Sequence, residues 1–250
     1  MARQSSFIKL EGTIGDVTFY KGRNGYNARQ KGGIPKERIM KDAKFQRTRE
    51  NLAEFARAAT AAKLLKRAFQ EIVAKARDAR THNRIYSQTI KVLKTDLVSD
   101  RGERKVEDGD ISLFTGFQFS SASVFESLVF ADHTVQDNGA QLVVTFNPFV
   151  PNRYLARPDG ATHFKMFMVA ASANFTDQTK QSAVVSSAEY SIGEDEVADL
   201  ILTVDKNQLA GADHFYALGI EFLQETNGKT YTLNNGAHNG AAIILTEEGT

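Results

Sequence analysis

The segments Leu200-Ile-Leu-Thr-Val204 and His214-Phe-Tyr-Ala-Leu-Gly-Ile-Glu-Phe-Leu223 decide the fold that we predict for this sequence. Both are rich in β-branched and aromatic residues, which favour strands. The dipeptide Asn227-Gly228 follows the second segment and is typical of a β-hairpin turn. We therefore predict two strands of an antiparallel sheet. Side chains alternate between the faces of a strand, so Leu218 and Ile220 should occupy successive inward positions.

The same pattern of short apolar segments separated by turn residues covers the chain from residue 107 to its end. Asp137-Asn-Gly139 marks a further hairpin turn. Because no helical run separates the segments, they favour an antiparallel β-sandwich over residues 107–250. The strands that we predict are 111–119, 128–135, 141–146, 163–173, 183–191, 198–204, 214–223, 230–233 and 241–245.

Tyr216 opens its strand directly after a tight corner, as the tyrosine corner of immunoglobulin-like (Ig-like) domains does. Leu218 stands where those domains often have a cysteine, and the chain contains neither cysteine nor tryptophan. Residues 107–250 therefore resemble an Ig-like domain without cysteine.

Residues 1–35 read as a small β-meander that ends in a glycine hinge, Lys31-Gly-Gly33. Its strands are predicted at 7–10, 17–20 and 26–29, with glycine turns between them. So short a meander cannot bury a core of its own. We expect this N-terminal arm to pair with another segment.

Residues 36–106 form a basic helical region between the arm and the sandwich. The run from Asp42 to Arg80 lacks Gly and Pro, and a second helix is predicted from His82 to Leu97. A straight helix over 42–80 would be about 57 Å long, so we expect it to project or to break near residues 56–62. Its apolar stripe comprises Leu52, Phe55, Ala59, Ala62, Leu65, Phe69, Ile72 and Ala76. The predicted class is α+β, with a β-meander arm, a long basic helix pair and an antiparallel Ig-like β-sandwich.

The charges divide at residue 106. Residues 1–106 contain 25 Lys and Arg against 11 Asp and Glu, a formal charge of +14, whereas residues 107–250 contain 6 against 19, a charge of −13. This asymmetry indicates a nucleic-acid-binding arm on a neutralising body, opposite ends that attract each other in neighbouring copies, or two halves that pack together.

The sequence offers no recognisable catalytic, cofactor or metal site. The five histidines lack the spacing of a metal site, and the glycine pairs lack the Gly-Lys-Ser/Thr ending of a phosphate loop. No cysteine is present to act as nucleophile or ligand. We predict that the protein is not an enzyme, needs no cofactor and has no identified small-molecule substrate.

The longest apolar run, Met166–Ala171, is too short to cross a membrane. The first residues lack the features of a signal peptide, so we expect synthesis in the cytoplasm.

Eleven residues are candidates for contacts with partners. The aromatic residues of the arm have two interpretations: they stack on nucleic-acid bases, or they pack within a sheet. The basic residues on one helix face also have two: they contact phosphates, or they form ordinary ion pairs within the helix. An acidic loop near residue 195 is a solvated loop rather than a cation site, because it lacks the spacing of a calcium loop. The candidates are Phe7, Phe19, Tyr20, Tyr26, Arg49, Arg57, Arg67, Lys75, Glu194, Glu196 and Asp199.

The first 55 residues resemble the N-terminal signature of a family of uncharacterised proteins from Bacteroidota genomes and their phage-like elements. The resemblance implies a lineage and no chemistry. The matching residues are Ile8-Lys-Leu10, Gly12-Thr-Ile-Gly15, Phe19-Tyr-Lys21, Ala28-Arg29, Lys31-Gly-Gly33, Arg38-Ile39, Asp42, Phe45, Arg47-Thr-Arg-Glu-Asn51 and Glu54-Phe55.

Together these features favour a non-enzymatic, self-assembling structural protein, such as a component of a filament, a tube or a phage-like particle. The arm of one copy would add to a neighbour, and the opposite charges would set a head-to-tail orientation. The alternative is a nucleic-acid-binding or nucleoid-associated protein that uses the basic N-terminal half.

Overall fold

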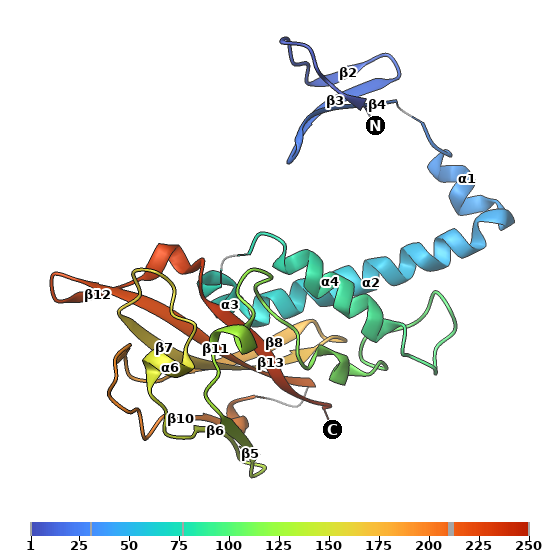
Figure 1. Cartoon of the computed structure of the whole chain (residues 1–250). Helices are drawn as coiled ribbons and strands as arrows, with labels where there is room; N and C mark the ends of the chain where they lie inside the picture. The colour runs from blue at the N-terminus through green and yellow to red at the C-terminus, as the bar shows by residue number, and fades with distance from the viewer. Residues whose placement is uncertain (1, 31, 77, 210–212, 250) are drawn as a thin grey trace. The chain divides into compact units, whose positions relative to one another are not determined.

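The computed structural model describes residues 2–30, 32–76, 78–209 and 213–249, and its elements are labelled in Figure 1. The chain divides into two compact units, Met1–Asn51 and Leu52–Thr250. Helices combine with antiparallel sheets, which confirms the predicted α+β class. The division at residue 51 differs from the boundaries that we predicted after residues 35 and 106, because the helices after residue 52 share a core with the sheets.

The first unit begins with a four-stranded antiparallel sheet in the order β1-β4-β3-β2, which we call the arm sheet. The strands predicted at 17–20 and 26–29 are confirmed. The strands are β1 (Ala2–Arg3), β2 (Gly12–Ile14), β3 (Val17–Gly22) and β4 (Gly25–Gln30). Helix α1 (Lys36–Lys41) and the 3-10 helix η1 (Ala43–Phe45) follow.

The strand predicted at residues 7–10 is wrong, because these residues form a loop between β1 and β2. The side chain of Gln4 takes the place of a strand partner. Its Oε1 accepts a hydrogen bond from the Leu10 backbone N–H at 2.8 Å, and its Nε2 donates to the Leu10 carbonyl at 3.2 Å. The chain thereby satisfies the Leu10 backbone without a strand, a local solution that apolar alternation does not reveal.

Three helices, α2 (Gln46–Ala68), α3 (Gln70–Lys75) and α4 (Thr81–Leu93), follow. The alanine-rich residues 56–62 stay helical, as alanine's high helix propensity allows, so the break that we expected there is wrong. The interruption lies instead at Phe69, whose φ and ψ are −97° and 27°. The Phe69 ring packs against those of Phe119 and Phe215, at centroid distances of 4.9 and 6.4 Å.

The large sheet of the second unit has six strands. Its order is β12-β11-β7-β8, with β13 also paired to β11 and β9 also paired to β7. The strands predicted at 163–173, 214–223 and 241–245 are confirmed. The strands are β7 (His163–Asn174), β8 (Thr179–Ser186), β9 (Tyr190–Ser191), β11 (Asp213–Thr226), β12 (Lys229–Thr232) and β13 (Gly240–Glu247).

A second, small sheet has three strands in the order β10-β6-β5. These are β5 (His133–Asp137), β6 (Gln141–Phe146) and β10 (Ile201–Asp205). The strand predicted at 141–146 is confirmed, and β6 has the same bounds. The remaining short helices are η2 (Ile111–Phe114), α5 (Phe125–Leu128), α6 (Pro151–Tyr154), η3 (Lys206–Gln208) and η4 (Leu233–Gly236).

Several predicted strands are wrong in part. Residues 187–189 of the strand predicted at 183–191 and residues 198–200 of the strand predicted at 198–204 are not strand. The start of 111–119 is the helix η2, because the Asp110 carboxylate accepts a hydrogen bond from the Ser112 N–H and caps it. The rest of that segment runs beside β13, where Phe119 N–H donates to the Ala241 carbonyl at 2.9 Å. The start of 128–135 is likewise occupied by α5 and a bridge, so only β5 is a strand.

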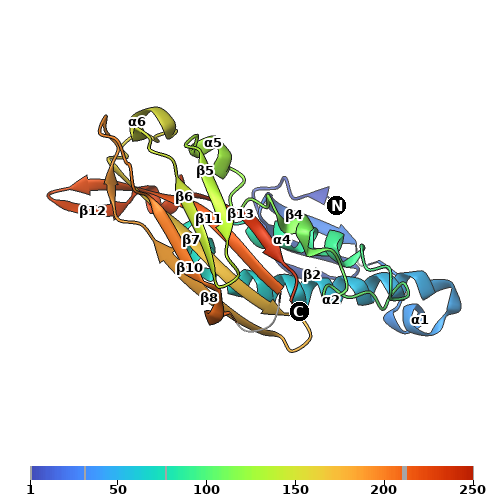
Figure 2. The same ribbon diagram turned by 90° about the horizontal axis from the view of Figure 1, so that it is seen from below.

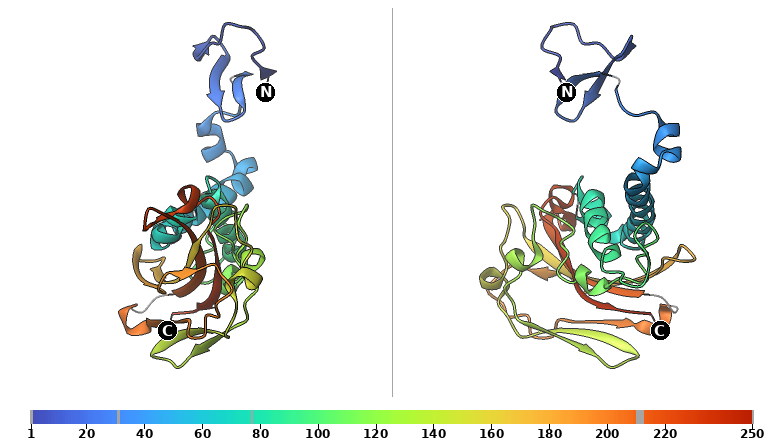
Figure 3. Two further views of the ribbon diagram at one scale, coloured as in Figure 1. Left: turned by 60° about the vertical axis from the view of Figure 1, so that its left-hand side comes forward. Right: turned by 90° about the vertical axis from the view of Figure 1, so that its right-hand side faces the viewer.

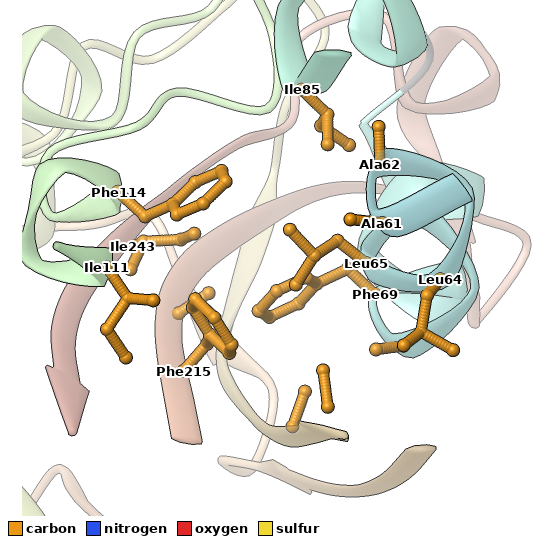
Figure 4. Close-up of a cluster of buried hydrophobic side chains, with 14 of the residues drawn as sticks. Ala61, Ala62, Leu64, Leu65, Phe69, Ile85, Ile111, Phe114, Phe215 and Ile243 are labelled. Atoms are coloured by element: carbon orange, nitrogen blue, oxygen red, sulfur yellow. The ribbon is translucent and has the colours of Figure 1, made fainter. Parts of the chain in front are cut away.

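The second unit is layered, with helices on one face of the large sheet and the small sheet on the other (Figure 3). Alternate residues of β11 contribute to the two cores. Phe215 faces the helices, where it lies near Leu65 and Phe69 (Figure 4). Tyr216 and Leu218 face the small sheet. The core against the small sheet also contains Leu142, Val144, Phe146, Leu202, Val204, Met166, Met168, Ile220 and Phe222.

Candidate assembly surface

The arm sheet has an apolar face and a polar face. Residues paired across strands point to the same side of a sheet. Phe19 pairs with Ala28 and with Gly12, and Val17 pairs with Ile14, so these side chains share one face. Tyr26 joins them opposite Lys21. We call this surface the arm face, and it comprises Ile14, Val17, Phe19, Tyr26 and Ala28.

No residue of the first unit is buried within the ranges 2–30 and 32–51 that the structure describes. Ile14 is 63% exposed, and Phe7 in the neighbouring loop is 93% exposed. Apolar groups gain free energy when they leave water, so this sheet gains little of it from its own packing. The arm face is therefore an apolar surface without a partner among the described residues of its unit.

Basic side chains border the arm face. Lys21 Nζ lies 5.5 Å from the centroid of the Tyr26 ring, and Lys9 Nζ lies 5.9 Å from it. The opposite face is polar and carries Arg3, Thr18, Tyr20, Asn27 and Arg29. There Arg29 lies over the Tyr20 ring, 5.7 Å from its centroid. The predicted arm aromatics Phe19 and Tyr20 thus lie on opposite faces.

The arm sheet is followed by an exposed segment without secondary structure, residues 32–35. Gly33 has a φ of +142°, which favours glycine. Lys31 of the predicted hinge lies outside the described residues.

The basic residues predicted on the helix face have different surroundings. Arg49 Nη1 donates to the carbonyls of Ile39 and Asp42 at 2.7 and 2.8 Å. It therefore ties the start of α2 to the turn before it. Arg67 is exposed, and no ion pair involves it among the described residues.

Arg57 and Lys75 bind groups of their own unit. Arg57 donates to the Gly102 carbonyl and to Glu103 Oε2, the latter at 2.9 Å. Lys75 Nζ donates to Glu221 Oε2 of β11 and lies 5.2 Å from the centroid of the Phe167 ring. Both side chains thereby fasten helices to neighbouring segments.

The acidic residues predicted near residue 195 lie in the loop before β10. Glu194 accepts hydrogen bonds from Asn152 Nδ2 at 2.8 Å and from Arg153 Nη2 at 3.4 Å. The bond from Asn152, with the nearby Arg153 charge, lowers the pKa of Glu194. Glu196 and Asp199 are exposed.

A network of polar side chains joins the two sheets. Lys206 Nζ donates to Asp137 Oδ2 at 2.8 Å and to Glu247 Oε1 at 2.7 Å. The Tyr216 hydroxyl donates to Glu247 Oε2 at 2.9 Å. The pKa of Tyr216 is raised by burial and by the Glu247 carboxylate. This partner is a side chain, whereas a tyrosine corner bonds to backbone.

The described residues contain no group of three His, Cys, Asp or Glu side chains placed to hold a metal ion. Within the same residues, no helix has both the length and the apolar composition needed to span a membrane.

Sequence reasoning selected Phe19 and Tyr26 but missed Ile14, Val17 and Ala28, which complete the arm face. Each is an aliphatic residue in a strand of six residues or fewer. Their common face follows from the register of four strands, which the sequence does not specify.

Comparison with protein-family models, with curated proteins and with solved structures found no match to this chain.

Proposed function

We propose that this protein is a non-enzymatic structural protein that assembles with copies of itself through its N-terminal arm. The observation that carries the proposal is the arm face, an apolar sheet surface in a unit without a buried residue among those described. Exposed apolar surfaces of this kind mark interaction sites. A second copy of the chain is the partner to which we commit.

Charge supports a head-to-tail arrangement. Residues 1–51 contain 12 Lys and Arg against 5 Asp and Glu, whereas residues 52–250 contain 19 against 25. The first unit therefore carries +7 and the second −6. Opposite charges on different units favour contacts between unlike surfaces of two copies and disfavour contacts between like surfaces.

The test compares two double variants of the full chain. Ile14→Gln with Phe19→Gln makes the arm face polar. Thr13→Gln with Thr18→Gln introduces the same side chains on the opposite face of the same two strands, which is polar already. Light scattering after size-exclusion chromatography measures their masses. We expect the first variant to be monomeric and the second to assemble like the wild type. Equal masses for both variants would contradict the proposal.

We infer that residues 107–250 of each subunit form an Ig-like sandwich and that the helices of residues 36–106 form a basic pair. Two antiparallel sheets around one core, with Leu218 and Ile220 both inside it, support the Ig-like part. Arg67, exposed on α2, and the positive charge of residues 36–106 support the basic helix pair.

Nucleic-acid binding is a second candidate function, favoured by the polar face of the arm sheet. Arg3, Arg29 and Tyr20 lie together there, and bases stack on aromatic rings while guanidinium groups bind phosphates. Purified wild type that binds nucleic acid should show raised absorbance at 260 nm, lowered by salt. The variant Arg3→Gln with Arg29→Gln should lose this absorbance. A wild type free of nucleic acid would exclude this function.

A further inference from the structure

The small sheet has one face against the core and one outer face. Because Thr145 pairs with Ile201 and with Thr134, these three residues lie in a row across the outer face. Ile201 is 55% exposed, although side chains of this type are usually buried. The view from below shows this sheet in front of the large sheet (Figure 2). The outer-face positions are Thr134, Gln136, Val143, Thr145, Ile201 and Thr203.

Acidic residues stand at both ends of this outer face. The alternation continues past the strand ends to Asp132 and Asp199, which are exposed. The Asn147 N–H donates to the Asp132 carbonyl at 2.9 Å, which extends the pairing of β5 and β6 by one residue. At the other end, Asp205 pairs with Gln141. The centre of the outer face is therefore uncharged and consists mainly of β-branched residues, with carboxylates at both ends. None of these outward-facing residues is basic.

The outer face matches the arm face in size and in charge. At about 4.8 Å per strand, three strands are about 14 Å wide and four strands about 19 Å wide. The centre of each surface is apolar or uncharged. Lys9 and Lys21 border the arm face, whereas Asp132 and Asp199 border the outer face. Two such surfaces pack as stacked sheets with their opposite charges at the rim.

We propose that the outer face of the small sheet is the surface on which the arm face of a second copy docks. This inference rests on the proposed function, because it names the surface that accepts the arm. Docking of two arm faces is disfavoured, since it would bring Lys9 and Lys21 of both copies together. Each copy then donates one arm and accepts another, an arrangement that forms rings or open chains of subunits.

The absence of cysteine makes crosslinking a direct test. One full-length chain carries Ala28→Cys on the arm face, and a second carries Thr145→Cys at the centre of the outer face. The two are mixed, treated with a short bis-maleimide crosslinker and analysed by peptide mass spectrometry. The controls are Thr18→Cys, on the polar face of the arm sheet, and Val184→Cys, which is 42% exposed on the large sheet.

We expect the crosslink between the Ala28→Cys chain and the Thr145→Cys chain to exceed either control pair roughly tenfold, because a docked contact raises the effective concentration of the two thiols. Crosslinks mainly between two copies of the Ala28→Cys chain, in a protein that still assembles, would overturn the outer face as acceptor and leave the proposed function standing. Monomers without crosslinks would overturn both. A chain with both substitutions that crosslinks within monomers would overturn docking on a second copy.

A charge reversal tests the rim separately. Asp132→Lys with Asp199→Lys in the full chain should raise the dissociation constant of assembly roughly tenfold, since two attractive pairs become repulsive. Asp159→Lys with Glu248→Lys makes the same change of net charge at exposed residues elsewhere, and it should change the constant less than about twofold by comparison. Equal effects of the two variants would contradict a specific rim.

Discussion

The side chain of Asp96 organises the loop after α4 through hydrogen bonds to the backbone. Its Oδ1 accepts hydrogen bonds from the N–H groups of Val98 and Ser99 at 2.8 and 2.9 Å, and its Oδ2 accepts one from Lys105 N–H at 3.0 Å. Burial raises the pKa of this carboxyl, but the hydrogen bonds outweigh it and lower the pKa to about 2. Its ionised form is thus a structural element of the loop.

We expect Asp96→Asn to lower the free energy of unfolding by about 1–3 kcal/mol at pH 7, because the amide replaces a charged acceptor of several backbone donors. The contribution of Asp96 should be present above its unfolded-state pKa, near 4, and lost as the pH falls towards 2. Urea unfolding at pH 7 and at pH 2.5 measures both effects. The exposed Asp108→Asn is the control, and an equal loss in the control would contradict this role.

A network of polar side chains ties β11 and β13 to the small sheet. It comprises Tyr216, Lys206, Asp137 and Glu247. Removal of the phenolic hydroxyl in Tyr216→Phe should cost about 1–2 kcal/mol of unfolding free energy, since Glu247 loses a donor. Burial and Glu247 raise the pKa of Tyr216, so its contribution should also disappear as the pH rises above 10, the ordinary pKa.

Chemical unfolding of both proteins between pH 7 and pH 11 checks this prediction. The difference in unfolding free energy between the wild type and Tyr216→Phe should become smaller at high pH. Tyr231→Phe, at a residue that is 57% exposed, should be neutral at all pH values. A constant difference between wild type and Tyr216→Phe would show that the hydroxyl acts only through packing.

The sequence predicts an element well where hydrophobic pattern alone decides it. Strand β6 has the alternation of one buried face, and the core strands β7 and β11 are long apolar segments. Elements set by one polar side chain are not predictable in this way. Gln4 removes a strand at residues 7–10, and Asp110 caps a helix where a strand was predicted. In both cases a side chain forms hydrogen bonds with nearby backbone groups, which then do not pair with a neighbouring strand.

The arm face and the outer face of the small sheet could likewise be predicted only in part from the sequence. Aromatic side chains drew attention to Phe19 and Tyr26, but the outer face of the small sheet consists mainly of Thr, Val and Ile, which are ordinary strand residues. Their functional interest arises because β5, β6 and β10 place them side by side and nothing among the described residues buries Ile201.

The helices and the sheets of residues 52–250 share a core and depend on each other for stability. Side chains of α2 and α4 bury the face of the large sheet that carries Phe167, Val169 and Phe215. Without residues 36–106 the part of this face that the helices cover would lie in water, at a cost of about 25 cal/mol per Å² of apolar area. A fragment of residues 107–250 is thus expected to lack a stable fold, although the sequence pattern alone favours a separate domain.

The fragment 52–250 should unfold cooperatively on heating, whereas the fragment 107–250 should bind hydrophobic dyes and show no sharp transition. Differential scanning calorimetry and dye fluorescence distinguish the two outcomes. A cooperative transition of the shorter fragment, at a temperature close to that of the longer one, would show that the helices contribute little to the stability of the sheets.

We propose that the chain assembles with itself through its N-terminal arm. Sedimentation equilibrium of the full chain over a wide range of protein concentrations measures this assembly. The mass of one chain is 27.6 kDa. We predict that the weight-average mass rises above this value with concentration and that it stays at the monomer mass when residues 1–35 are removed. A full chain that remains at 27.6 kDa at every concentration would contradict the claim.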